Sequence, residues 1–252
     1  FVIMGSMPPG LPEDYYGQVL GAAQGAGRVV VDTVVGVPHI ISALRRTDPA
    51  KTDAVFKVNA AELCRMADVA VAGGEADGAD ASTVRRAASA FLAKHVGKTG
   101  ERCPVKNLCV TDGRHAAYLV HVDDSVEGGL AMYRLGVPDL SSHARGRGRL
   151  YPIGAGDSVA AGLAAGWTHL SSSVKQGENL AIQLDGAVIE ALDRVVGGLT
   201  KVHGEEAAHL LASFALGLAC GSASCLEEEN SVFKVHIVVE MLSMVVDDVT
   251  KL

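Results

Sequence analysis

The sequence is short of aromatic residues and of basic charge, and the second shortage excludes a class of function. Aromatic residues make up 4% of the 252 residues, so alanine, valine, leucine and 29 glycines carry most of the apolar content. Lysine and arginine number 22 against 29 acidic residues, which gives a net charge of −7. A negative field repels phosphate backbones, so we expect no nucleic-acid partner. A local basic pocket for a small anion is still compatible with this charge.

Paired cysteines and long hydrophobic runs are also missing. The five cysteines are odd in number and form no C-x-x-C pair, which excludes a disulfide framework and a zinc knuckle and favours a reducing compartment. No apolar run reaches the ~20 residues that a bilayer span needs. We therefore expect a cytoplasmic protein without a membrane partner. A peroxisome-like organelle is the alternative, because Thr250-Lys251-Leu252 is similar to the S-K-L address.

What is present predicts an α/β fold. Hydrophobic residues make up 48% and mean hydropathy is +0.24, enough for a large core. Strand-like runs alternate with helical patterns, which is typical of a largely parallel sheet. We expect strands at residues 1–4, 28–32, 54–58, 107–111 and 116–121. We expect helices at residues 12–26, 38–46, 59–71, 81–96, 157–169, 175–196, 205–221 and 235–249. Polar, glycine-rich residues 72–80 and 141–149 are expected to be loops, the second of them mobile.

One short motif stands out, the sequence YPIGAGDS at residues 151–158. Glycines directly before a helix let backbone amides converge on an anion, and the helix dipole adds positive potential there. Asp157 follows at the expected helix start, where a carboxylate could deprotonate a hydroxyl nucleophile during phosphoryl transfer. The alternative is a glycine-rich turn with Asp157 as the helix N-cap. The motif alone leaves both interpretations open.

The wider sequence resembles a known family. Residues 154–157 (GAGD) closely resemble the signature of the PfkB, or ribokinase-like, carbohydrate kinases. Four more motifs follow the family's order: residues 5–10 (GSMPPG), 57–62 (KVNAAE), 110–113 (VTDG) and 219–224 (ACGSAS). They are similar to its G-S-x-P-x-G loop, its K-P-N-x-x-E segment, its V-T-x-G turn and the small-residue helix beside its nucleotide. Val58 stands where the family usually has proline.

The resemblance implies a fold and a reaction. The fold would be a ribokinase-like three-layer sandwich, with a largely parallel sheet flanked by helices. The reaction would be ATP-dependent phosphoryl transfer to a hydroxyl of a sugar or sugar phosphate. Asp157 would be the general base. The backbone amides of Gly154, Ala155 and Gly156 would form the anion hole for charge that develops on the phosphoryl oxygens.

Further site residues follow from the same resemblance. Asn59 and Glu62 would organise Mg²⁺, and they lie one helical turn apart, so both can face one site. A capping box formed by the same two residues is an equally compatible interpretation. Thr111 and Gly113 would lie along the ATP phosphates and ribose, although a plain strand-ending turn would explain them too.

Two more residues complete the expected nucleotide and phosphate contacts. Lys57 would point a cation toward phosphate, as in family members that use phosphosugars; the alternative is a solvated surface charge. Ser222 lies in the small-residue segment and would contact the nucleotide.

The chain also departs from the family pattern. The family's N-terminal strands, its β-lid and its sugar-gripping residues have no counterpart here. We therefore expect residues 1–252 to be the nucleotide-binding and catalytic part of a single domain truncated at its N-terminus. The chain as given is expected to bind ATP or ADP weakly and to bind no sugar saturably.

The substrate and the activity are open at this stage. The motifs at residues 5–10 and 57–62 are most similar in sequence to those of the branch that phosphorylates hexose phosphates (1-phosphofructokinase and tagatose-6-phosphate kinase). The alternative function is a non-catalytic nucleotide-binding domain for regulation or assembly, against which the intact Asp157 argues. Small molecules are the expected ligands, and a homodimer is one assembly open to the chain.

Overall fold

The computed structural model describes residues 1–23, 25–47, 52–70, 78–95, 103–144, 149–171 and 184–252. The chain divides into two compact units. Unit 1 comprises Phe1–Arg134 and Thr250–Leu252, and unit 2 comprises Leu135–Val249. Each unit is described by itself below.

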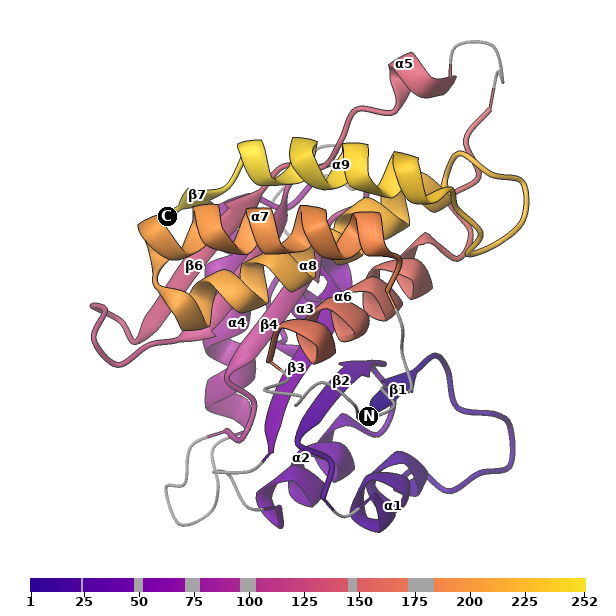
Figure 1. The fold of residues 1–252 in the computed structure, drawn as a ribbon. Coiled ribbons are helices and arrows are strands. Elements are labelled where there is room, and N and C mark those ends of the chain that lie inside the picture. The colour runs from indigo at the N-terminus through magenta and orange to yellow at the C-terminus, as the bar shows by residue number, and fades with distance from the viewer. Residues whose placement is uncertain (24, 48–51, 71–77, 96–102, 145–148, 172–183) are drawn as a thin grey trace. The chain divides into compact units, whose positions relative to one another are not determined.

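Unit 1 is built on a seven-stranded sheet in which the strands lie in sequence order (Figure 1). The first four strands are parallel, whereas β5 runs antiparallel to β4 and β7 antiparallel to β6. The strands are β1 (Val2–Met4), β2 (Arg28–Asp32), β3 (Asp53–Asn59), β4 (Asn107–Thr111), β5 (Ala117–Val122), β6 (Leu130–Leu135, which continues one residue into unit 2) and β7 (Thr250–Lys251). The parallel part of the sheet confirms the α/β prediction.

The sequence of β2 explains its place inside the sheet, between β1 and β3. Its three valines are all buried, as in a parallel strand covered on both faces. The predicted bounds of β2 and β4 are confirmed, while β6 and β7 were not predicted. A strand of two residues has no periodicity to detect, and a short apolar run such as that of β6 does not distinguish strand from helix.

Four helices belong to unit 1: α1 (Tyr15–Ala22), α2 (Val37–Arg45), α3 (Ala60–Met66) and α4 (Ala81–Lys94). One hydrophobic cluster joins them to one face of the sheet. Leu20, Ile40, Leu63 and Phe91 come from the four helices in turn, and Phe56 comes from β3. The alternate residues of the strands, including Lys57, belong to the opposite face of the sheet.

Unit 2 is helical, with α5 (Ser141–Ala144), α6 (Ala155–Ser171), α7 (Gly186–His203), α8 (Glu205–Ser224) and α9 (Val235–Asp247). Helix α8 packs against α6, α7 and α9. By length and composition α8 could cross a membrane, but 89% of its most apolar window is buried inside the structure. That burial is typical of a core helix.

Helices α6 and α8 approach each other closely because glycines face each other across the contact. A Cβ added at Gly162 would lie 2.9 Å from Gly217 Cα, and one added at Gly217 would lie 2.5 Å from Val159 O. Real Cβ atoms have no room at such distances. The glycines of this helix pair therefore set the distance between α6 and α8.

Two sequence predictions in unit 2 need correction. A loop was expected over residues 141–149, but its first four residues form α5, because Asp139 accepts hydrogen bonds from Ser141 N and Oγ, both at 2.9 Å. A helix was expected over residues 175–196, whereas α7 begins at Gly186, after its N-cap Asp185. Residues 145–148 and 172–183 lie outside the described part of the chain.

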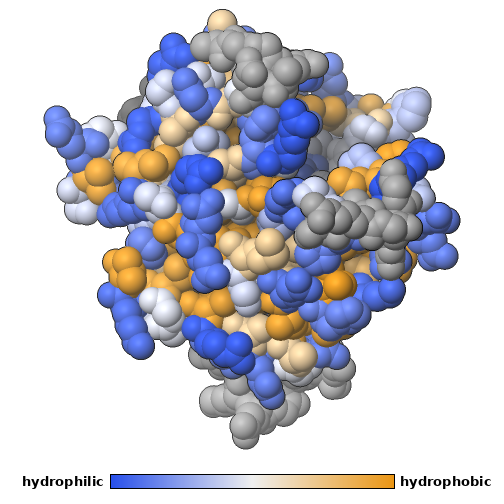
Figure 2. Space-filling model, turned by 90° about the horizontal axis from the view of Figure 1, so that it is seen from above, coloured by the Kyte–Doolittle hydropathy of each residue, from blue (hydrophilic) through white to orange (hydrophobic). Residues whose placement is uncertain are grey.

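Hydrophobic side chains also reach the surface of unit 2, among them Ile153, Val202, Val232 and Phe233. On the face in Figure 2, hydrophobic residues gather in several small groups between hydrophilic ones. Such scattered exposure is ordinary for a folded protein and does not mark a docking surface.

Candidate functional site

The first turn of α6 in unit 2 has the geometry of an anion-binding site. Gly154, directly before the helix, has φ +81°, a left-handed conformation that glycine adopts without strain. Its carbonyl accepts the first helical hydrogen bond from Ser158 N at 3.0 Å. The Ala155 amide donates to Pro152 O at 3.2 Å, while the amides of Gly156 and Asp157 donate to no acceptor in the described part of the chain. These two amides are available to an anion.

Asp157 lies inside the helix rather than at its cap. Helix α6 begins at Ala155, two residues before the predicted start, so the N-cap interpretation of Asp157 is wrong. The Asp157 side chain is exposed and accepts no hydrogen bond from any described residue. Next to it, Ser158 Oγ is buried and has no hydrogen-bond partner among the described residues. The turn therefore presents an uncommitted carboxylate beside uncommitted amides.

The small-residue segment of α8 packs against this turn. A Cβ added at Gly221 would lie 2.5 Å from Val159 Cγ2 and 3.0 Å from Ala155 O. Ser222 follows in the last turn of α8 and is buried. Small residues at positions 219–224 thus allow α8 to approach the anion-binding turn. A nucleotide contact from Ser222 stays a prediction.

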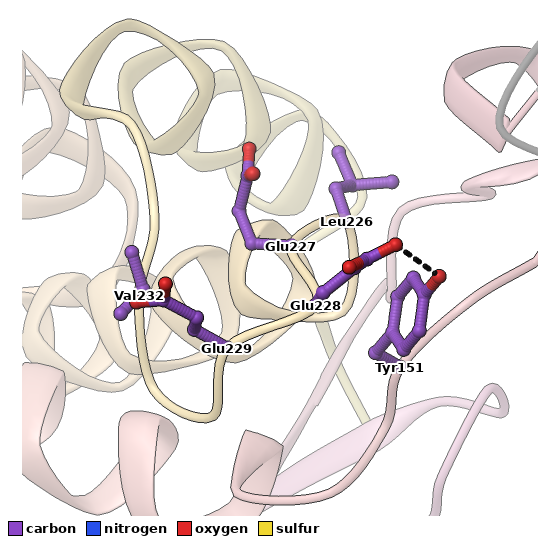
Figure 3. A pocket seen from close by; sticks show the side chains of 6 residues that line it. All are labelled: Tyr151, Leu226, Glu227, Glu228, Glu229 and Val232. Carbon is purple, nitrogen blue, oxygen red and sulfur yellow. Dashed lines mark hydrogen bonds between the residues drawn. The ribbon is translucent and has the colours of Figure 1, made fainter.

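Beside the turn lies a pocket of about 540 Å³, which Figure 3 shows from close by. Tyr151, Leu226, Val232 and three consecutive glutamates, Glu227, Glu228 and Glu229, line it. The Tyr151 hydroxyl donates to Glu228 Oε1 at 3.0 Å, and Lys234 Nζ lies 3.5 Å from Glu227 Oε1. Consecutive carboxylates repel phosphate groups and accept hydrogen bonds from N–H donors. The pocket and the anion-binding turn therefore suit groups of opposite polarity.

In unit 1, the predicted site residues gather where the parallel strands end. Asn59 ends β3 and Thr111 ends β4, and the two are paired in the sheet register. In open parallel sheets this carboxyl edge is where ligands bind. Gly113 follows in a turn with φ +58°. Asp112 Oδ2 accepts a hydrogen bond from Ala79 N at 2.6 Å, which ties this turn to the residues before α4.

Asn59 and Glu62 form the capping box of α3. Asn59 Oδ1 accepts from Glu62 N at 2.8 Å, and Glu62 Oε2 accepts from Asn59 N at 2.9 Å. The capping interpretation is confirmed. The box uses only one of the two carboxylate oxygens of Glu62, so a role in organising Mg²⁺ is compatible with it.

Lys57 is neither solvated nor isolated. Its side chain is 7% exposed, and Nζ lies 3.1 Å from both carboxylate oxygens of Asp32 on the neighbouring strand β2. The expectation of a solvated alternative is wrong, and a phosphate near Lys57 would have to compete with Asp32. Sequence analysis missed Asp32. The available signal was a carboxylate at the end of a strand whose three core residues are all valine.

Metal ligands are sparse in the described residues. They contain no group of three or more histidine, cysteine, aspartate or glutamate side chains that could hold a metal ion. Asn59 and Glu62 offer oxygen donors, which suit Mg²⁺. Mg²⁺ commonly keeps several waters and takes further oxygens from substrate phosphates, so such a small donor set fits it.

Comparison with known proteins bears on the fold. No protein-family model matches the sequence, and no curated protein matches it either. Among solved structures, phosphofructokinase-2 from Escherichia coli in complex with potassium is similar, with a TM-score of 0.56 and 18% identity over 96% of this chain. The same enzyme with substrates and products gives a TM-score of 0.55 and 18% identity over 97%. Ribokinase from Giardia lamblia gives a TM-score of 0.50 and 13% identity over 92% of this chain.

These similarities define the fold of the chain. It is the ribokinase-like fold of the PfkB carbohydrate kinases, and the solved neighbours that share it are sugar kinases. The chain spans 55% of the length of the potassium-bound phosphofructokinase-2 and 64% of that of the ribokinase. The fold therefore agrees with the family that the five sequence motifs resemble.

Proposed function

We propose that this chain is the nucleotide-binding and catalytic part of an ATP-dependent kinase whose acceptor is a hydroxyl of a sugar or sugar phosphate. One observation carries the proposal. At the start of α6, the amides of Gly156 and Asp157 are free to bind an anion, and the Asp157 carboxylate beside them is exposed and unbonded among the described residues. The sugar-kinase fold of the solved neighbours supports the same conclusion.

The chemistry assigns each group a task. The Asp157 carboxylate accepts the proton of the acceptor hydroxyl as its oxygen attacks the γ-phosphorus, and the bond from that phosphorus to the β–γ bridging oxygen breaks. The amides at the start of α6 stabilise charge on the transferred phosphoryl oxygens, at the positive end of the helix dipole. Positioning and electrostatic stabilisation of this kind provide most of the catalysis in phosphoryl transfer.

Residues of unit 1 would serve the nucleotide. Mg²⁺, when bound, neutralises charge on the ATP phosphates. Asn59 and Glu62 would hold it, largely through water, and their capping box keeps both side chains at the carboxyl edge of the sheet. Thr111 and Gly113 would line the phosphates and ribose from the neighbouring strand end.

A hexose phosphate is the acceptor class that the sequence favours. Lys57 is the cation that would meet a phosphate group, in exchange for its present bond to Asp32. Asp32 ends β2, and Lys57 lies two residues before the end of β3, near the carboxyl edge of the parallel strands. A buried lysine that already has a carboxylate partner needs a dianionic competitor, which a phosphate monoester provides.

Phosphoryl transfer from labelled ATP tests the proposal. The 252-residue chain is incubated with ATP and Mg²⁺ and with a panel of hexoses and hexose phosphates, and calorimetry with ADP is run in parallel. We expect weak ADP binding, and slow transfer to at least one member of the panel at a rate that rises linearly with acceptor concentration and does not saturate. ADP binding without any transfer would favour the non-catalytic alternative, and absence of both would contradict the proposal.

A further inference from the structure

The loop that follows α8, residues 225–234, is bonded to both ends of the segment that precedes α6, residues 151–154. At the first end, Tyr151 N donates to Cys225 O at 2.8 Å, and the Tyr151 hydroxyl donates to Glu228 Oε1 at 3.0 Å (Figure 3). At the other end, Ser231 Oγ donates to Gly154 O at 3.3 Å. Four residues held at both ends have little freedom to change the direction in which they enter the helix.

Ser231 makes its contact from an unusual backbone conformation. Its φ of +59° is left-handed, and among the described residues Asp68 is the one other non-glycine residue with a positive φ. This region is unfavourable for residues other than glycine, asparagine and aspartate, and such conformations persist where neighbouring structure enforces them. A glycine would adopt the conformation without strain. The chain instead places here a residue whose hydroxyl reaches the anion-binding turn.

Gly154 faces Ser231 with a matching conformation. A Cβ added at Gly154 would lie 2.9 Å from Ser231 Oγ and 3.3 Å from Asn230 Cβ. The loop therefore contacts Gly154 at the position where any other residue would carry its side chain. A side chain at residue 154 would obstruct this approach.

The carbonyl that Ser231 holds is also the first helical acceptor of α6. Gly154 O accepts from Ser158 N at 3.0 Å as well as from Ser231 Oγ at 3.3 Å. The direction of this carbonyl fixes the plane of the peptide between Gly154 and Ala155. The amides of Gly156 and Asp157 lie in the next two peptide planes, and the helical φ and ψ angles of Ala155 and Gly156 relate those planes to the first one. Their orientation therefore depends on the direction of the Gly154 carbonyl.

We propose that Ser231 is a positioning residue for the anion-binding turn, through its hydrogen bond to the Gly154 carbonyl. The proposal rests on the proposed function in one respect: the anion is taken to be a nucleotide phosphate. Ser231 itself touches no reacting group. Its hydroxyl holds the turn in the direction in which the free amides of α6 can meet that phosphate.

Ser231→Gly separates positioning from backbone strain. Glycine removes the hydroxyl and also relieves the left-handed strain, so unfolding stability should stay equal or rise. The lost hydrogen bond should nevertheless weaken ADP binding about two- to tenfold. A merely structural role predicts no loss of ADP affinity. Asp68→Gly is the matched control, because it puts glycine at the other left-handed non-glycine position among the described residues, in a loop of unit 1. Its ADP affinity should equal that of the wild type.

Amide hydrogen exchange without nucleotide provides a second readout. In Ser231→Gly, the Ser158 amide should exchange about two- to tenfold faster, because its acceptor carbonyl is less restrained. Weaker ADP binding together with faster exchange supports the proposal, and unchanged values of both overturn it. If the wild-type chain binds no ADP, the proposed function fails. Amide exchange at Ser158 in Ser231→Gly then decides the role of Ser231 alone: faster exchange supports that role, and unchanged exchange overturns it.

Discussion

Replacement of Gly217 by alanine tests the close contact of α6 and α8 in unit 2. The new Cβ would lie 2.5 Å from Val159 O and 3.1 Å from Leu163 N, both backbone atoms of α6. Relaxed contacts between such atoms lie at about 3.5 Å, so α6 and α8 must separate by about 1 Å. Overpacking of this kind costs about 1–3 kcal/mol, against which alanine regains about 1 kcal/mol of helix propensity. Because backbone on both sides resists the shift, we expect a net loss of about 1–2 kcal/mol.

Gly197 on α7 provides the matched control. It is an exposed glycine inside a helix, and a Cβ there would meet nothing within 4 Å. Gly197→Ala should therefore gain up to about 1 kcal/mol from propensity alone. Urea denaturation measures the change in unfolding free energy of each variant. The two changes should have opposite signs and differ by roughly 1–3 kcal/mol. If Gly217→Ala stabilises the chain as much as Gly197→Ala does, the described helix contact is wrong.

Two further predictions concern unit 1. Glu62→Gln should raise the Mg²⁺ concentration needed for half-maximal phosphoryl transfer, because an amide binds a hard dication less well than a carboxylate. The retained side-chain oxygen still accepts the capping hydrogen bond. A Mg²⁺ titration that overlays the wild type would leave Glu62 as a cap alone. Lys57→Met should lower the unfolding free energy by up to about 3 kcal/mol, because the Asp32 carboxylate, which is 13% exposed, loses its buried ammonium partner. Lys57→Met with Asp32→Leu should recover most of that loss in the same denaturation assay, and a double variant no more stable than the single one would refute the contribution of this ion pair.

Much of the fold was predictable because its signals are local. The valine run of β2 and the residues of β4 gave correct bounds, since continuous burial on both faces leaves a clear apolar pattern. The capping box of Asn59 and Glu62 was equally visible, because its two residues are three positions apart. The start of α6 was placed two residues late, because glycine and alanine before Asp157 carry no periodic signal.

The contacts that were missed join residues far apart in sequence. Asp32 and Lys57 meet only because β2 and β3 are neighbours in the sheet. The contact of Ser231 with Gly154 depends on a left-handed serine in a loop, which no composition or period reveals. The same limit applies to the pocket beside Tyr151, whose lining joins Tyr151 to Glu228, 77 residues further along the chain. Motifs located the anion-binding turn, whereas the structure was needed to find what holds it.

The role of Asp157 is the central claim, and a single-turnover measurement of Asp157→Asn tests it most directly. The amide keeps the shape of the side chain but cannot accept the proton, so phosphoryl transfer to the acceptor found in the panel should fall by about 10²–10⁴-fold. The ATP dissociation constant, measured separately by calorimetry, should stay within a few-fold of the wild type. Asp193→Asn, at an exposed position of α7, is the matched control and should leave both quantities unchanged. An Asp157→Asn variant that retains most of its single-turnover rate would contradict the account.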